Sequence, residues 1–229
     1  MRKNGSRLIS VKQYKTTDLF LFAVILIVSE VLGHYATVWF SSSAYFVLSL
    51  TVPISALVIA RWGWWGVFYP LIGGLTGCIL SKASINYYVS YCVGGMALGL
   101  MLLPAKLIGI DKIRSKWYYT ALFAIGAWVS VYLGRSLMWM AAFAVKPVKG
   151  STLTAGFTGF GLDVLSLVIG VIVLLLMRRL DGMFEDQKSY LKRIDKERRD
   201  RMKYDEYAEP GELDEEALSV LHRDNDLYD

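Results

Sequence analysis

Apolar residues fill most of the chain between about residues 18 and 180, and short polar or glycine-containing clusters interrupt them. A helix that crosses about 30 Å of hydrocarbon needs roughly 20 apolar residues, so this stretch can hold about six spans. The turns are predicted at 41–43, 61–66, 81–86, 109–116 and 146–150. The spans are therefore expected at 18–40, 43–61, 63–82, 84–106, 116–143 and 153–178.

Composition supports this interpretation, because 55% of the residues are hydrophobic and the charged residues crowd into the two ends of the chain. We expect an all-α membrane protein with a basic N-terminus (1–17), a six-helix transmembrane domain (18–180) and a charged tail (181–229). The first apolar run is longer than the core of a cleaved signal peptide, and no A-x-A-like site follows it. It is therefore expected to remain as a span.

The distribution of Lys and Arg orients the predicted bundle. One side carries the N-terminus, Arg61, Lys106, Lys112, Arg114, Lys116, Arg178 and Arg179, whereas the other carries Lys82, Lys146 and Lys149. Cytoplasmic loops are enriched in basic residues, so both termini are expected in the cytoplasm of a multi-pass protein, in a bacterial plasma membrane. The tryptophans near predicted span ends suit an aromatic belt; they are Trp39, Trp62, Trp64, Trp65 and Trp117.

Glycine is frequent in the third and fourth predicted spans. The third contains Gly73, Gly74 and Gly77, and the fourth contains Gly94, Gly95 and Gly99. Such spacing lets helix backbones approach closely, so tight packing of the two helices is one interpretation. A binding role for exposed backbone is the other. Cys78 and Cys92 in the same spans are expected to be small buried hydrophobic residues.

The tail differs from the rest of the chain. Leu180, Phe184, Leu191 and Ile194 fall on one side of a predicted helix that is otherwise rich in charged residues. Such a helix suits the inner membrane surface or a partner protein, and the acidic residues after Met202 also suit a solvated, partly disordered tail.

Ionisable residues within spans are costly and usually face a cavity or one another. Glu30 and His34 lie in the first span, Arg135 in the fifth and Asp163 in the sixth. With a rise of about 1.5 Å per residue, Glu30, Arg135 and Asp163 lie roughly 12–15 Å below the outer ends of their spans. This common depth predicts one pocket in the outer half of the bilayer.

Aromatic residues share helix faces with these groups, which predicts an aromatic pocket that charges orient. The candidate site residues are Glu30, His34, Tyr87, Tyr91, Tyr132, Arg135, Trp139, Phe160 and Asp163. Three interpretations of Arg135 stay open: snorkelling to the interface, a structural pair with Glu30 or Asp163, and contact with a ligand.

Motifs of enzymes are not found in the sequence. It contains no H-E-x-x-H, G-x-S-x-G, Walker lysine loop or C-x-x-C, and His34 is the only histidine within the predicted spans. We therefore expect no catalytic residues, metal or cofactor and no nucleic-acid partner. Energy for uphill transport would have to come from an ion gradient or another subunit.

The turn and third span, "RWGWWGVFYPLIGGLTGCILS", and the sixth span, "GLDVLSLVIGVIVLLLMRRLDG", resemble those of the substrate-binding S subunits of energy-coupling factor (ECF) transporters. The resemblance covers roughly residues 18–182. It implies that the chain binds a vitamin or related micronutrient from outside. It also implies association with a transmembrane scaffold subunit and two cytoplasmic ATPases of an ABC transporter.

The sequence departs from this family at two places. The A-x-x-x-A pattern on which the scaffold often docks is absent, because Ile27 follows Ala23 at that spacing, and the tail is longer than the family needs. One hypothesis is that the tail contacts the ATPases or the scaffold. Two further hypotheses are a non-transporting scaffold or sensor that works through its tail, and a membrane enzyme that uses Glu30 or Asp163 as a base.

Overall fold

The computed structural model describes residues 11–40, 48–145 and 164–207, and within them it is all-α, without a strand. Phe160 and Asp163 lie outside the described residues. The helices before the tail are α1 (Val11–Phe40), α2 (Thr51–Trp62), η1 (Gly63–Phe68), α3 (Tyr69–Leu80), α4 (Ile85–Tyr88), η2 (Val89–Val93), η3 (Gly94–Met101), α5 (Leu102–Ile108), α6 (Ile110–Ser115), α7 (Trp117–Val145) and α9 (Val164–Met177). Helix α10 (Gln187–Tyr207) follows.

Four helical segments of the described chain are long and apolar enough to cross a membrane, so the protein is a multi-pass membrane protein. These segments are Val11–Trp39, Thr51–Leu80, Ile85–Ile108 and Trp117–Ala141. Helix α9 is a fifth, shorter apolar helix. The abundant exposed leucine, isoleucine, valine and phenylalanine side chains agree with this, since lipid tails rather than water are their natural surroundings.

The segment Thr51–Leu80 is helical throughout, but it folds back on itself at Gly63. Gly63 has φ +60° and ψ −120°, a conformation that glycine tolerates far better than other residues. Beyond this turn, Gly66 lies against Ser55 and Ile59, and Gly73 lies against Thr51. Helices α2 and α3 therefore run antiparallel. The predicted span 43–61 is wrong at its start, because residues 48–50 are not helical and α2 begins at Thr51.

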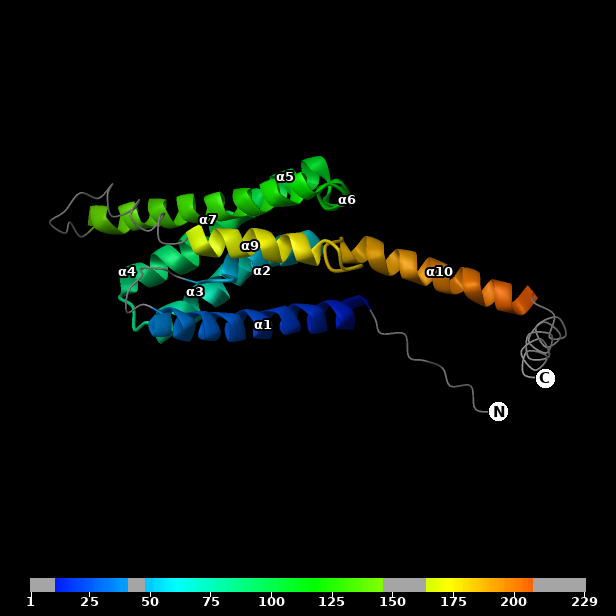
Figure 1. Ribbon diagram of the computed structural model, residues 1–229, viewed down its shortest axis with the longest axis horizontal. Helices are drawn as coiled ribbons and strands as arrows, with labels where there is room; N and C mark the ends of the chain where they lie inside the picture. The colour runs from blue at the N-terminus through cyan, green and yellow to red at the C-terminus, as the bar shows by residue number, and fades with distance from the viewer. Residues whose placement is uncertain (1–10, 41–47, 146–163, 208–229) are drawn as a thin grey trace, which may run out of the picture. The chain divides into compact units, whose positions relative to one another are not determined.

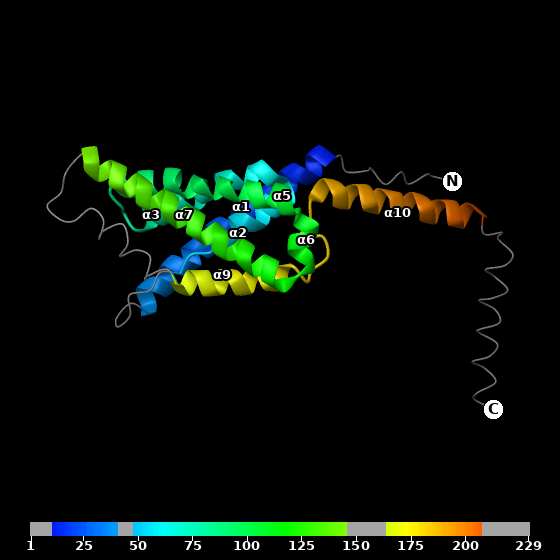
Figure 2. The same cartoon turned by 90° about the horizontal axis from the view of Figure 1, so that it is seen from above.

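The helices of the bundle lie along one common direction, with α4 at one end and α6 at the other (Figure 1). Helix α7 crosses the bundle obliquely (Figure 2). Helix α2 forms the centre, because nearly all its residues are buried. Helices α1 and α7 each bury one side and leave the other apolar side exposed.

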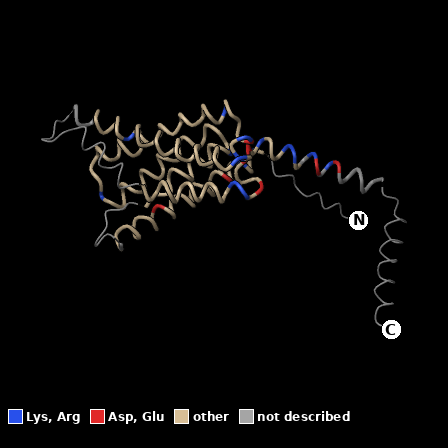
Figure 3. The backbone as a smooth tube through the Cα atoms, turned by 45° about the horizontal axis from the view of Figure 1, so that its top comes forward, with Lys and Arg blue, Asp and Glu red and all other residues tan. Residues whose placement is uncertain are grey.

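Charged residues of the bundle gather at the end where α6 lies (Figure 3). At this end a buried ion pair joins α1 to α2: Arg61 Nη2 is 2.8 Å from Asp18 Oδ1, with side chains only 4% and 10% exposed. The indole Nε1 of Trp62 donates to Asp18 Oδ2 at 2.6 Å. Trp62 is thus buried, and its assignment to an exposed aromatic belt is wrong, whereas Trp39, Trp64, Trp65 and Trp117 are exposed.

The segment that follows α9 is packed into the same end of the bundle. Phe184 is fully buried against Phe123, with ring centroids 6.1 Å apart. Arg114 pairs with buried Glu185 at 3.0 Å, and Gln187 accepts a hydrogen bond from Tyr14 at 3.2 Å. This compact unit extends to Gln187, and a second unit begins at Lys188.

The predicted amphipathic helix that contains Leu180, Phe184, Leu191 and Ile194 is wrong at its start. Leu180 and Phe184 lie in turns, and α10 begins only at Gln187. The reason is tertiary: Arg61 donates to the carbonyls of Gly182 and Met183, which draws this segment out of helical geometry. Gly182 itself has φ +71°, which favours glycine.

Candidate functional site

A cavity of about 630 Å³ opens in the bundle at the end where α4 lies, away from the basic end. Cavities that bind small molecules have volumes of about 300–1,000 Å³. Its wall is formed by α1, the start of α2, α3, the α3–α4 turn, α4, η2 and α7. The lining residues include Glu30, His34, Thr37, Ser49, Thr51, Gly73, Gly74, Gly77, Cys78, Lys82, Tyr87, Tyr91 and Arg135.

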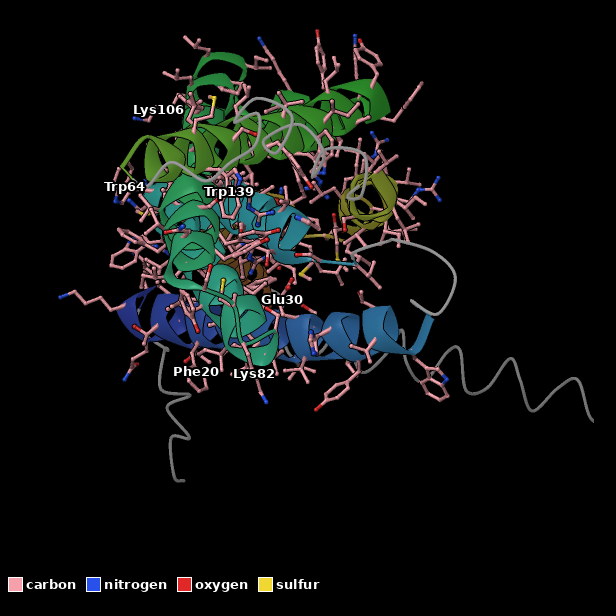
Figure 4. The ribbon with its side chains drawn as sticks, turned by 90° about the vertical axis from the view of Figure 1, so that its left-hand side faces the viewer. Phe20, Glu30, Trp64, Lys82, Lys106 and Trp139 are labelled. Carbon is pink, nitrogen blue, oxygen red and sulfur yellow. The ribbon has the colours of Figure 1, made fainter. Side chains whose placement is uncertain are left out.

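Glu30 points from α1 into the space between α1 and the helices that face it (Figure 4). One carboxylate oxygen, Oε1, accepts hydrogen bonds from Ser49 Oγ at 2.8 Å and Thr51 Oγ1 at 2.8 Å. The same atom accepts from the backbone N–H groups of Leu50 at 3.1 Å and Thr51 at 3.0 Å. These are unsatisfied donors of the α2 N-terminus, where a negative charge is favourable. Glu30 therefore caps α2 from another helix.

Arg135 lies on α7, and its guanidinium stacks on the Tyr91 ring, 4.3 Å from the ring centroid. The backbone at Arg135 is fixed, since Ser90 Oγ donates to its carbonyl at 2.9 Å and Gly94 approaches it closely. Arg135 thus faces the cavity from the side opposite α1.

Tyr87, Tyr91 and Trp139 form an aromatic wall. The rings of Tyr87 and Tyr91 are 6.1 Å apart, and those of Tyr87 and Trp139 are 4.6 Å apart. Tyr91 belongs to η2, a π-helical turn, which is a rare feature that is frequent at functional sites. Tyr87 remains 43% exposed, so an entering molecule can contact its ring.

The structure brings together five of the candidate residues, because Glu30, His34, Tyr87, Tyr91 and Arg135 all line the cavity. Trp139 does not line it but contacts the ring of Tyr87. Tyr132 is buried and packs on Trp128, 4.4 Å between ring centroids, outside the lining. Phe160 and Asp163 lie beyond the described residues, so their predicted roles stay predictions.

Sequence reasoning missed the polar floor formed by Ser49 and Thr51. The signal was available, because Pro53 follows closely and proline favours the first turn of a helix. It also missed Asp18 as the partner of Arg61 at the basic end. Lys82 lies at the rim, and its side chain points away from the bundle (Figure 4).

The arrangement is suited to binding a small molecule. It combines an aromatic wall, hydroxyl groups, charges of both signs and an opening at one end of the bundle. The described residues contain no group of three or more His, Cys, Asp or Glu side chains that could hold a metal ion. The chain matches no protein-family model, and no curated protein or solved structure shows significant similarity to it.

Proposed function

We propose that this chain is the substrate-binding subunit of an ECF-type uptake transporter that captures a vitamin or related micronutrient. The cavity is the observation that supports the proposal. It lies within an apolar bundle, has the volume of a small-molecule site and opens at one end. A closed, fully packed bundle would instead favour a structural role.

The orientation of the cavity supports uptake from outside. Basic residues gather at the opposite end of the bundle, and the positive-inside rule places that end in the cytoplasm. In this proposal the antiparallel pair α2 and α3 counts as two spans, and the predicted span 153–178, to which α9 belongs, counts as the last. Six spans then leave both termini in the cytoplasm and the cavity in the outer half of the bilayer.

Partners supply the energy in this proposal. A transmembrane scaffold subunit and two cytoplasmic ATPases would bind the loaded subunit and release the ligand inward, as the family resemblance implies. Because the A-x-x-x-A pattern is absent, the scaffold would contact another exposed apolar surface. Reconstitution of the chain with such a module should give ATP-dependent uptake, and uptake without the module would contradict the proposal.

The first test is a thermal-shift screen of the purified protein against vitamins, including thiamine and pyridoxine. A ligand at about 100 times its Kd stabilises the folded state by about 2.7 kcal/mol, which raises Tm. For the compound that raises Tm, Arg135→Ala should weaken binding by more than about tenfold, or 1.4 kcal/mol. Lys116→Ala, at the other end of the bundle, is the matched control.

A second candidate function is a membrane scaffold or sensor that works through its tail. The observation that favours it is the separate unit that begins at Lys188 and contains most of the highly charged helix α10. This function predicts that no vitamin raises Tm and that removal of residues 188–229 abolishes capture of a cytoplasmic protein. The transporter proposal predicts that vitamin binding survives this removal.

A further inference from the structure

The glycines of α3 are not equivalent, and their difference bears on what the cavity can hold. A Cβ atom added to Gly74 would lie 2.9 Å from the carbonyl oxygen of Tyr91, and one added to Gly73 would collide with Thr51. These two glycines are therefore required for close packing. A Cβ added to Gly77 would meet no atom of the described residues within 4 Å, although Gly77 lines the cavity. Packing gives no reason for a glycine at this position.

Gly77 and Tyr87 lie at the same level of one helical hairpin. Gly74 contacts Tyr91, and the turn at residues 81–84 connects the two arms. Gly77 lies between that contact and the turn on one arm, and Tyr87 lies between them on the other. A surface of bare helix backbone therefore lies beside the aromatic wall.

The aromatic wall is held in place by neighbouring side chains. Trp139 packs on Tyr87, and the Arg135 guanidinium packs on Tyr91. Rings that are fixed in this way retain a flat, preorganised surface, and aromatic rings favour offset-stacked or edge-to-face contact with another ring. The bare α3 backbone at Gly77 and the aromatic wall both line the cavity, so a ring that enters beside Gly77 can stack on Tyr87 and Tyr91 or meet them edge to face, which favours a planar aromatic molecule.

We propose that Gly77 determines the specificity of the cavity by leaving room for a planar aromatic or heteroaromatic ring, which lies on the α3 backbone and contacts Tyr87 and Tyr91. This inference rests on the proposed function and narrows its substrate class. A side chain at position 77 occupies the place of the ring. Puckered, saturated rings of similar size fit poorly.

The first experiment tests the shape of the cavity without a known ligand. In the full chain with Cys78→Ala and Cys92→Ala, we introduce Gly77→Cys and measure its reaction with N-phenylmaleimide and N-cyclohexylmaleimide, whose rings are planar and puckered. The rates of the same two reagents with Lys116→Cys, at an exposed position, correct for the intrinsic reactivity of the two maleimides. The corrected rate should favour the planar reagent by about tenfold, equivalent to about 1.4 kcal/mol.

The second experiment uses whichever vitamin raises Tm in the screen. Gly77→Val should keep the Tm of the unliganded protein within error, since its side chain enters open space, and should weaken binding by about tenfold or more. Gly170→Ala is the control, because its Cβ would lie 3.5 Å from Pro53, an ordinary contact away from the cavity. It should leave both Tm and affinity unchanged.

The outcomes separate the two proposals. Equal corrected rates for the two maleimides, or unaltered affinity in Gly77→Val, overturn the planar-ring inference even if a vitamin binds. Preferred reaction of the planar reagent together with no vitamin that raises Tm supports the shape of the cavity and counts against vitamin uptake. Failure of both maleimides to react at position 77 overturns the inference and the binding site together.

Discussion

Two carboxylates of α1 hold the two ends of α2. Glu30 caps the first turn of α2, and Asp18 pairs with Arg61 and Trp62 in its last turn. Helix α2 is largely buried and has no side-chain cap within its own sequence. Charged groups in an apolar bundle are costly unless they are paired and hydrogen-bonded. Asp18 is both paired and hydrogen-bonded, and Glu30 accepts hydrogen bonds from the N-terminus of α2.

Loss of one partner of the buried pair should be strongly destabilising. Asp18→Leu leaves Arg61 buried beside an apolar group, so we expect a loss of about 3–5 kcal/mol in the free energy of unfolding. Thermal denaturation of the purified protein measures the change. The double variant Asp18→Leu with Arg61→Leu should recover part of the stability, and a double variant as unstable as the single one would contradict the pairing.

Glu30→Gln tests the cap on α2. The amide keeps one acceptor oxygen but loses the charge, and hydrogen bonds to charged groups contribute about 1.5–3 kcal/mol compared with about 1 for neutral ones. We therefore expect a loss of about 1–2 kcal/mol in stability. An unchanged Tm would show that Glu30 does not stabilise α2. Contact with a ligand would then be the remaining role for Glu30.

At the scale of the elements, glycine decides how closely helices approach. Gly94 lies against the backbone of Arg135 and Gly134, so η3 and α7 meet almost backbone to backbone. Gly94 therefore serves close helix packing, which was one of its two interpretations. The helix that it contacts is α7, whereas the sequence suggested the third predicted span. Gly95, by contrast, does lie against Pro70 of α3.

Gly94→Ala should therefore destabilise the bundle. Its Cβ would lie 2.7 Å from Arg135 Cα, and backbone atoms cannot move aside cheaply. We expect a loss of about 1–3 kcal/mol, typical of overpacking. Gly77→Ala on the neighbouring helix is the matched comparison, and equal Tm values for the two variants would contradict the close contact.

At the scale of the whole molecule, the boundary of the bundle lies beyond the last apolar helix. Phe184, Glu185 and Gln187 are buried, so the residues from 181 to Gln187 belong to the bundle and not to the tail. A deletion of residues 185–229 would therefore remove buried groups as well as the tail. The tail hypothesis is better tested by a chain that ends at Gln187.

Two truncations should separate these effects. A chain that ends at Gln187 should keep the Tm of the full chain, whereas one that ends at Gly182 loses the buried Phe184. Removal of a buried Phe side chain typically costs about 3–5 kcal/mol. The measurement is thermal denaturation of both chains, and similar Tm values would show that the segment does not stabilise the bundle.

The sequence by itself determined where the helices lie and that they belong in a membrane. Apolar runs of span length follow from the thickness of the bilayer, so the predicted segments 84–106 and 116–143 agree closely with Ile85–Ile108 and Trp117–Val145. The predicted segment 18–40 ends with its helix, but the helix Val11–Phe40 begins seven residues earlier. It also indicated that Glu30 and Arg135 face a common space, because ionisable groups at similar depth avoid lipid.

Only the tertiary structure decided what these groups do. That Glu30 caps α2, that Arg61 pairs with Asp18 and that Phe184 is buried all depend on contacts between distant parts of the chain. Hydropathy along one helix reports how apolar its surroundings are, but not which neighbour supplies a donor. The same limit applies to Gly74 and Gly77. Both are glycines of α3, but Gly74 packs against Tyr91 and Gly77 faces open space, and the sequence does not distinguish them.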